Sequence, residues 1–165
     1  MRVRNLALVS VMTPLVTVIT MFFRIPIPAT EGYFNFGDAA VILVSMLLGP
    51  YVGLLAGGLG SSLADIISGY AFYAPATFVA KSLEGFIVGT IFAKFYKKSK
   101  PVAYMSGPIG GVFMILSYFS FESYFLGVVA ALVELPLNVL QALLGSAIAY
   151  LLYNLVHPLV AKSLK

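Results

Sequence analysis

Charged and amide side chains recur at helical spacing inside two of the most apolar stretches of the chain. Lys81 and Glu84 stand three residues apart and therefore share one face of a helix. Glu134, Asn138 and Gln141 follow one another at i, i+4 and i+7, which also forms a single stripe. Side-chain amides both donate and accept hydrogen bonds. Together these groups predict the polar wall of a pocket for a small heteroaromatic ligand.

Each stripe also has a structural interpretation. Lys81 and Glu84 can neutralise each other as a buried pair, and the stripe from Glu134 to Gln141 can form hydrogen bonds between helices. A third row, Gly53-x-x-x-Gly57-x-x-x-Ser61, has only small side chains and predicts close helix packing. The sequence leaves the structural and ligand-binding interpretations of the two polar stripes open.

The composition requires a membrane environment for these stripes. The chain has 165 residues, of which 61% are hydrophobic and 10% charged, and its mean hydropathy is +1.01. Soluble domains carry about 25% charged residues. One helical span needs roughly 20 apolar residues, so the length allows about six. The apolar runs are continuous and do not alternate as in a β-barrel. We therefore expect an all-α integral membrane protein with a single domain over residues 1–165.

The apolar runs predict where the helices lie. A break at Gly49-Pro50 is expected because proline lacks an N–H group and restricts the residue before it. The segment before this break has only 11 residues, so either residues before Asp38 are helical or this helix is partly re-entrant. The predicted helices are 5–23, 38–48, 51–68, 74–93, 101–119 and 128–160.

The basic residues support six transmembrane helices with both termini in the cytoplasm, in a multi-pass protein of the cell membrane. With the break at Gly49-Pro50, most Lys and Arg side chains fall on one side, as the positive-inside rule requires. Without the break, the basic loop at 94–100 would be external. The basic residues on the predicted cytoplasmic side are Arg2, Arg4, Lys94, Lys97, Lys98, Lys100, Lys162 and Lys165.

Several kinds of chemistry have no support in the sequence. The chain has no cysteine and a single histidine, His157, so no metal site, catalytic site or cofactor is predicted. The glycine-rich run 57–60 lacks the Gly-Lys-Ser/Thr ending of a phosphate-binding loop, so the chain has no ATPase motif of its own. The net charge of +4 is explained by membrane topology, and no nucleic-acid partner is expected.

Six short motifs in order resemble one known family. The resemblance is dense from about residue 32 to 90 and loose elsewhere. These motifs are Gly32-Tyr-Phe-Asn-Phe-Gly-Asp38, Leu48-Gly-Pro-Tyr-Val-Gly53, Gly57-Gly-Leu-Gly-Ser-Ser-Leu-Ala-Asp65, Gly69-Tyr70, Tyr73-Ala-Pro-Ala76 and Lys81-Ser-Leu-Glu-Gly85. They are similar to the substrate-binding S components of energy-coupling-factor (ECF) vitamin transporters, in the branch that binds hydroxymethylpyrimidine, pyridoxine and riboflavin.

The resemblance implies a six-helix protein that captures a vitamin from outside. It then delivers the vitamin to a transmembrane T subunit and two cytoplasmic ATPases. The substrate site implied by the resemblance, combined with the polar stripes, consists of Asn35, Tyr73, Lys81, Glu84, Tyr118, Glu134, Asn138 and Gln141. The family often docks its T subunit through an Ala-x-x-x-Ala pattern on the first helix. Here Ala7 is followed by Val11 and the nearest small residue is Ser10, so Ala7 and Ser10 are the expected docking positions.

The stretch from Gly32 to Leu43 is expected to be an external loop that leads into the second helix. In this loop Asn35 and the aromatic residues cover the ligand, and Gly32 and Gly37 give the loop freedom to open. Asp38 is expected to be structural, as a carboxylate that caps the start of the second helix.

The substrate and the mode of transport are the open points. Mixed acid, base and amide groups favour the thiamine pyrimidine precursor or a vitamin B6 form, with riboflavin as a further candidate. A different class of function is an autonomous secondary transporter that uses Lys81, Glu84 or Glu134 as a proton relay. An intramembrane enzyme would need a nucleophile–base pair or a metal site, and the sequence offers neither.

Overall fold

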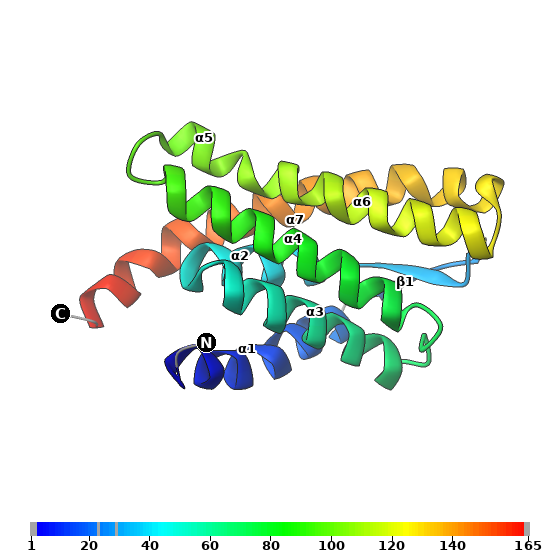
Figure 1. Cartoon of the computed structure of the whole chain (residues 1–165), viewed down its shortest axis with the longest axis horizontal. Helices are drawn as coiled ribbons and strands as arrows, with labels where there is room; N and C mark the ends of the chain where they lie inside the picture. The colour runs from blue at the N-terminus through cyan, green and yellow to red at the C-terminus, as the bar shows by residue number, and fades with distance from the viewer. Residues whose placement is uncertain (1–2, 23, 29, 164–165) are drawn as a thin grey trace.

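The computed structural model describes residues 3–22, 24–28 and 30–163, and Figure 1 shows a bundle of helices with a small hairpin at one end. Long helices dominate the described chain, which confirms the predicted fold class. The elements in chain order are α1 (Val3–Phe22), β1 (Arg24–Ile27), β2 (Gly32–Asn35), α2 (Gly37–Leu48), α3 (Pro50–Ile67), α4 (Ala74–Phe95), α5 (Lys100–Tyr104), α6 (Ser106–Phe125) and α7 (Val128–Ser163).

The helix boundaries follow the predicted breaks. Gly49 separates α2 from α3 with a φ of 88°, and Pro50 occupies the first turn of α3, where a missing N–H costs nothing. The single segment predicted at 101–119 is the short α5 followed by α6, which continues to Phe125. The predicted end of the first helix, residue 23, lies outside the described residues.

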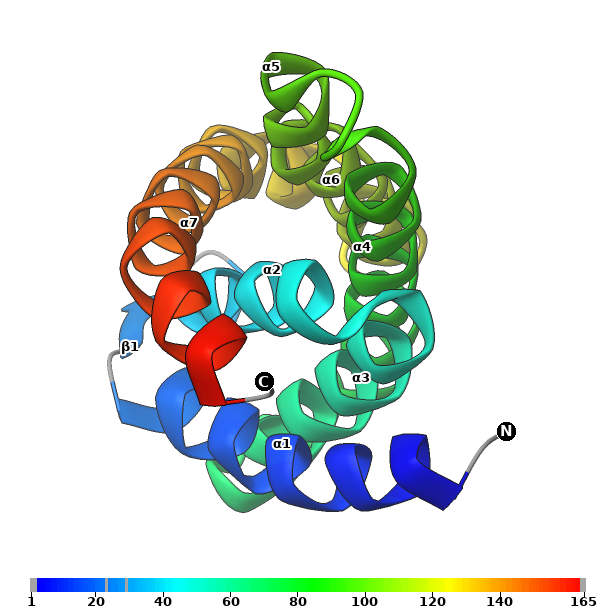
Figure 2. The same cartoon turned by 90° about the vertical axis from the view of Figure 1, so that its left-hand side faces the viewer.

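The central helix, α2, is too short to span a membrane by itself. Five of the described helices are long and apolar enough to do so by length and composition, namely α1, α3, α4, α5–α6 and α7. Nine of the twelve residues of α2 are buried, and Figure 2 shows α2 inside a ring formed by the other helices. The number of crossings remains a prediction.

Both ends of the described chain lie at the same end of the bundle as the α4–α5 turn (Figure 1). This turn carries the basic run from Lys94 to Lys100, so the arrangement supports the predicted charge asymmetry, although the cytoplasmic side remains a prediction. Arg2 and Lys165 lie outside the described residues, as does the side chain of Lys162. We call the end with the termini the inner end and the opposite end the outer end.

The inner end is filled by aromatic side chains. Phe92 packs against both Tyr96 and Tyr153, with ring centroids 4.8 and 4.9 Å away. His157 stacks on Tyr153 at 4.9 Å. These contacts give the only histidine of the sequence a packing role among apolar rings.

The segment expected to be a loop at the outer end is a β-hairpin. Strands β1 and β2 pair antiparallel from Arg24 opposite Asn35 to Ile27 opposite Gly32. An isolated two-stranded hairpin is marginally stable, so packing on the helices must support it. The idea that residues just before Asp38 are helical is wrong, because β2 ends at Asn35 and α2 begins at Gly37.

The pair α3 and α4 forms the tightest crossing in the bundle. A Cβ atom on Gly85 would lie 2.4 Å from the carbonyl oxygen of Gly53, and one on Gly57 would lie 3.2 Å from that of Lys81. The small-residue row is therefore confirmed as a packing surface, and it brings the two helix backbones into direct contact.

Candidate ligand-binding site

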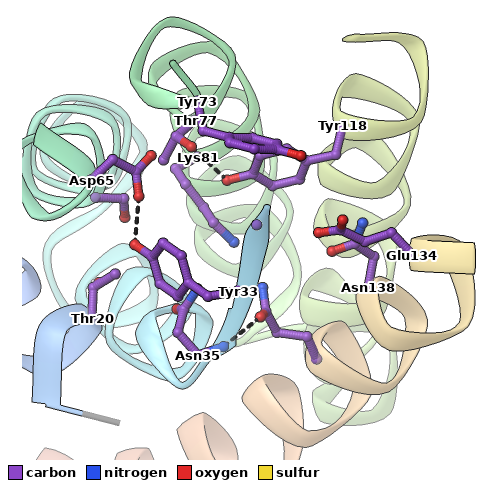
Figure 3. Close-up of a pocket in the computed structure, with 13 residues that line it drawn as sticks. Thr20, Tyr33, Asn35, Asp65, Tyr73, Thr77, Lys81, Tyr118, Glu134 and Asn138 are labelled. Atoms are coloured by element: carbon purple, nitrogen blue, oxygen red, sulfur yellow. Dashed lines mark hydrogen bonds between the residues drawn. The ribbon is translucent and has the colours of Figure 1, made fainter. Parts of the chain in front are cut away.

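A cavity lies under the hairpin, between α1, α3, α4, α6 and α7 (Figure 3). Its free volume is about 20 Å³, which is enough for about one water molecule. A vitamin-sized molecule therefore needs wall side chains or the hairpin to move. The lining residues are Thr20, Gly32, Tyr33, Asn35, Ser61, Asp65, Tyr73, Thr77, Lys81, Tyr118, Glu134, Asn138 and Gln141.

The structure brings together seven of the eight residues predicted for the substrate site. Those that line the cavity are Asn35, Tyr73, Lys81, Tyr118, Glu134, Asn138 and Gln141. Glu84 does not line it. The Glu84 side chain is fully buried behind Lys81, so it contacts the lysine from the inner side.

Two carboxylates hold the Lys81 ammonium at the inner floor of the cavity. Lys81 is 1% exposed and forms an ion pair with Asp38, while its Nζ lies 3.4 Å from Glu84 Oε2. We call Asp38 and Glu84 the inner carboxylates. The predicted Lys81–Glu84 pair is present. The second partner of Lys81, Asp38, lies on α2, so the residue spacing within α4 could not predict it.

Asp38 and Asn35 have different roles from those expected at the start of α2. The Gly37 N–H donates to Asn35 Oδ1 over 2.7 Å, so Asn35 satisfies the beginning of the helix. Asp38 instead accepts a hydrogen bond from Gln141 Nε2 over 3.1 Å and pairs with Lys81. The expectation that Asp38 caps the helix is therefore wrong, although its contacts remain structural.

Gln141 connects the hairpin to the inner carboxylates. Its Oε1 accepts a hydrogen bond from the Asn35 backbone N–H over 2.8 Å, and its Nε2 donates to Asp38. Both ends of this amide are thus engaged within the protein. Gln141 positions β2 against the floor of the cavity.

Two further carboxylates lie at the outer end, on α6 and α7, and we call Glu122 and Glu134 the outer carboxylates. Glu122 is fully buried, and neither of its oxygens has a hydrogen-bond partner among the described residues. Glu134 is 5% exposed, and its Oε2 has no hydrogen-bond partner in the same part of the chain. In Figure 3 Glu134 points into the cavity beside Asn138.

Tyrosine hydroxyl groups form the wall opposite α7. The Tyr33 hydroxyl donates to Asp65 Oδ1, and the Tyr118 hydroxyl donates to Thr77 Oγ1 over 2.9 Å. Burial, together with the negative charge of Asp65, raises the pKa of Tyr33. The Tyr33 phenol therefore stays protonated and remains a hydrogen-bond donor on the hairpin.

Tyr73 separates the cavity from an outer cleft. Its ring lines both spaces, and its hydroxyl donates to the Thr30 carbonyl oxygen in the hairpin turn over 2.8 Å. The outer cleft has a volume of about 470 Å³ and includes Glu31, Tyr70 and Phe72. Tyr73 thus closes the cavity toward the outer end and anchors the hairpin turn.

Gly32, at the start of β2, and Gly37, at the start of α2, serve close packing. A Cβ atom on Gly37 would lie 2.4 Å from Thr20 Oγ1, and one on Gly32 would lie 3.1 Å from Glu134 Oε1. Neither glycine has a positive φ. Both positions need a small residue because α1 and α7 approach the hairpin closely. The predicted freedom of this loop to open stays a prediction.

Sequence reasoning did not assign Thr20, Ser61 and Asp65 to the site, and it included Tyr33 only among the aromatic residues expected to cover the ligand. Asp65 is an ionisable residue in an apolar helix, which is by itself a signal of a buried polar site. Tyr33 precedes Asn35 by two residues, so strand alternation would have placed both on one face. The hydroxyl groups of Thr20 and Ser61 carry no such signal in apolar helices.

The two positions expected to dock the T subunit, Ala7 and Ser10, are exposed on α1. The Ser10 hydroxyl donates to the Leu6 carbonyl oxygen over 3.0 Å, so this side chain folds back onto its own helix. In a membrane protein an exposed apolar face also contacts lipid. Docking through Ala7 and Ser10 therefore stays a prediction.

Comparison with known protein families matches residues 1–158 to a family described as ECF-type riboflavin transporter, S component. The chain belongs to this family. The membership confirms the resemblance to ECF S components inferred from the motifs between residues 32 and 90, and it assigns the chain to a family of membrane transport subunits.

One relative and one solved structure place this S component among known proteins. A protein of Pyrococcus woesei, described as an uncharacterized protein in the gap 3' region, is 41% identical over 149 residues, covering 88% of this chain and 99% of that protein. A structure described as the S component of a bacterial ECF transporter is 18% identical, with a TM-score of 0.77 over 95% of this chain and 97% of that one. The second similarity supports the fold.

Proposed function

We propose that this S component is the high-affinity substrate-binding subunit of an ECF-type ABC importer in the cell membrane. It captures a small water-soluble vitamin or precursor at the outer end and delivers it to a T subunit with two ATPases. The observation that carries the proposal is the cavity under the hairpin, where amide, hydroxyl and carboxylate groups converge within an apolar bundle.

The choice of vitamin lies among a few heteroaromatic compounds. The name of the matched family points to riboflavin, whereas the polar stripes favour the thiamine pyrimidine precursor or a vitamin B6 form. Tyr73 and Tyr118 offer ring faces for stacking, and Asn138 brings a side-chain amide to the same cavity. The tyrosine rings and the Asn138 amide suit a flat ligand ring that has both hydrogen-bond donors and acceptors along its edge.

Binding to the purified protein is the direct test. Riboflavin, pyridoxine, hydroxymethylpyrimidine and thiamine are titrated by calorimetry in detergent, and we expect at least one dissociation constant below about 10 μM. Asn138→Ala should weaken that binding. Val139→Ala, at the adjacent and half-exposed position on α7, is the matched control and should not. Failure of all four compounds to bind would contradict the proposed vitamin capture.

Delivery is tested by reconstitution in lipid vesicles. We expect uptake of the bound compound only with the T subunit, both ATPases and ATP. Uptake driven by a proton gradient without these subunits would instead support the secondary transporter with Lys81, Glu84 and Glu134 as a proton relay. Alanine at Lys81 or Glu84 alone does not separate the two mechanisms, because both residues also stabilise the floor of the cavity.

A further inference from the structure

The acidic residues of this chain gather around the cavity. The sequence has six Asp and Glu residues, and only Glu31 among them is exposed. The other five are at most 5% exposed. They are Asp38, Asp65, Glu84, Glu122 and Glu134.

Lys81 is the only buried basic side chain in the described part of the chain, and it is already engaged. Both ion pairs found among the described residues are those of Lys81 with the inner carboxylates. Arg24, on the hairpin, is exposed and lies 5.9 Å from the centre of the Tyr33 ring. Among the described residues, the carboxylates on the other walls therefore have no ion-pair partner.

Two of the unpaired carboxylates, Glu134 and Asp65, line the cavity. Glu134 lines the cavity and points into it (Figure 3), with its Oε2 unpartnered among described residues. Asp65 lines the opposite wall; its Oδ1 accepts from Tyr33 and its Oδ2 has no hydrogen-bond partner there. Glu122 does not line the cavity, and both of its oxygens are unpartnered among the described residues. Carboxylates buried in an apolar interior need a counter-charge or a proton.

We propose that the cavity selects a ligand that carries a positively charged nitrogen, such as a protonated amine or a quaternary ring nitrogen. Glu134 and Asp65 are the groups that meet this charge, and Glu122 adds to the negative field at the outer end. This inference rests on the proposed function and specifies the chemical class of its substrate. It predicts that neutral flavins are not the preferred ligands.

Two further observations support an organic cation. No cluster of three or more His, Cys, Asp or Glu suitable for a metal ion occurs among the described residues. The rings of Tyr73 and Tyr118 line the same cavity, and aromatic faces attract organic cations. A flat cationic ring or an amine on a ring would use both the carboxylates and the tyrosines.

A matched pair of ligands tests this inference on the unmodified protein. Pyridoxamine and pyridoxine differ by an amine in place of a hydroxyl group, and thiamine and riboflavin provide a second cationic and neutral pair. Calorimetry at neutral pH should show at least one cationic compound binding about tenfold or more tighter than its neutral counterpart. Because this comparison needs no variant, it does not depend on whether a substituted protein folds.

Glu134→Gln then tests the assigned residue. The substitution should weaken binding of the cationic ligand by about tenfold and change the affinity for the neutral ligand by no more than about threefold. Glu31→Gln, which removes the exposed carboxylate at the hairpin turn, is the matched control and should change neither.

Two results would overturn the inference and leave vitamin capture intact. One is riboflavin binding more tightly than thiamine and pyridoxamine, with no effect of Glu134→Gln. The other is a neutral ligand binding tightest with uptake of a proton, seen as a dependence of the binding heat on the ionisation enthalpy of the buffer. Absence of binding by all four compounds would contradict both this inference and the proposed function.

Discussion

The inner and outer carboxylates are buried to a similar extent but differ in their ion-pair partners. Asp38 and Glu84 share the ammonium group of Lys81, and Asp38 also accepts a hydrogen bond from Gln141. Glu122 and Glu134 have no ion pair within the described residues. Within the described residues, one acidic pair is therefore neutralised by a lysine of the same chain, and the other has no cationic partner.

This difference suggests a structural role for the inner carboxylates and, under our proposal, a role in ligand binding for the outer ones. A buried ion pair contributes little net stability but is costly to break from one side, so the inner set should dominate the response to mutation. The outer set should dominate the response to ligand chemistry. Asp65 stands between them, since one oxygen is bonded to Tyr33 and the other is unpartnered among described residues.

The largest expected effect is on the inner set. Lys81→Met leaves Asp38 and Glu84 buried without a cation, which should lower the free energy of unfolding by about 3–5 kcal/mol. Thermal denaturation in detergent measures the loss. Lys97→Met, in the exposed α4–α5 turn, is the control and should change little.

A rescue experiment sharpens this prediction. Adding Asp38→Asn and Glu84→Gln to Lys81→Met removes the unpaired charges and should recover much of the lost thermal stability. A single Lys81→Met variant as stable as the unmodified protein would show that the inner carboxylates do not depend on this lysine.

Tyr33→Phe tests the intermediate case. Without the phenol hydroxyl, Asp65 loses its hydrogen bond from Tyr33, which should cost about 1.5–3 kcal/mol, as for a hydrogen bond to a charged group. Denaturation monitored as before gives the value. Tyr124→Phe, at a residue that is 83% exposed, serves as the comparison. Equal stability of both variants would mean that Asp65 does not require the hairpin.

Asn35→Ala tests the connection between hairpin and helix. The loss of the acceptor for the Gly37 N–H should cost about 1 kcal/mol, as for other helix caps. Ligand affinity should fall with it, by about fivefold for that free energy, because Asn35 also lines the cavity. Calorimetry with the bound vitamin checks this, with Asn5→Ala near the inner end as control. Unchanged affinity would remove Asn35 from the site.

The smallest effect is expected at Glu122. Glu122→Gln replaces a buried carboxyl that has no protein partner, so stability should stay within about 1 kcal/mol of the unmodified protein or rise. The melting temperature of both proteins in one detergent decides this. A loss above about 2 kcal/mol would show that Glu122 is paired after all and that the two acidic sets are alike.

Periodicity predicted four of the residues that line the cavity, Lys81, Glu134, Asn138 and Gln141, because they project from long helices. The stripe of Glu134, Asn138 and Gln141 lies on one wall, as the i, i+4 and i+7 spacing requires. Spacing within a helix says nothing about partners on another helix, so the Lys81–Asp38 pair and the linking role of Gln141 were not predicted. The assignment of Asp38 as a cap failed for this reason.

The hairpin was missed because its sequence lacks the usual strand signals. Arg24-Ile-Pro-Ile contains a proline, which is tolerated only in edge strands or bulges, and each strand has only four residues. Its support comes from contacts far away in the sequence, such as Asn35 with Gln141 and Tyr33 with Asp65. Those contacts become visible only after the helices are packed.

The direct backbone contact between α3 and α4 has a consequence for how the cavity can widen. Gly53 and Gly85 touch through main-chain atoms, so this side cannot yield by rearranging side chains. On the opposite side, Pro136 lies within α7 between Glu134 and Asn138, and proline removes one main-chain hydrogen bond of the helix. We therefore expect α7 and the hairpin, rather than α3 and α4, to move when the cavity widens.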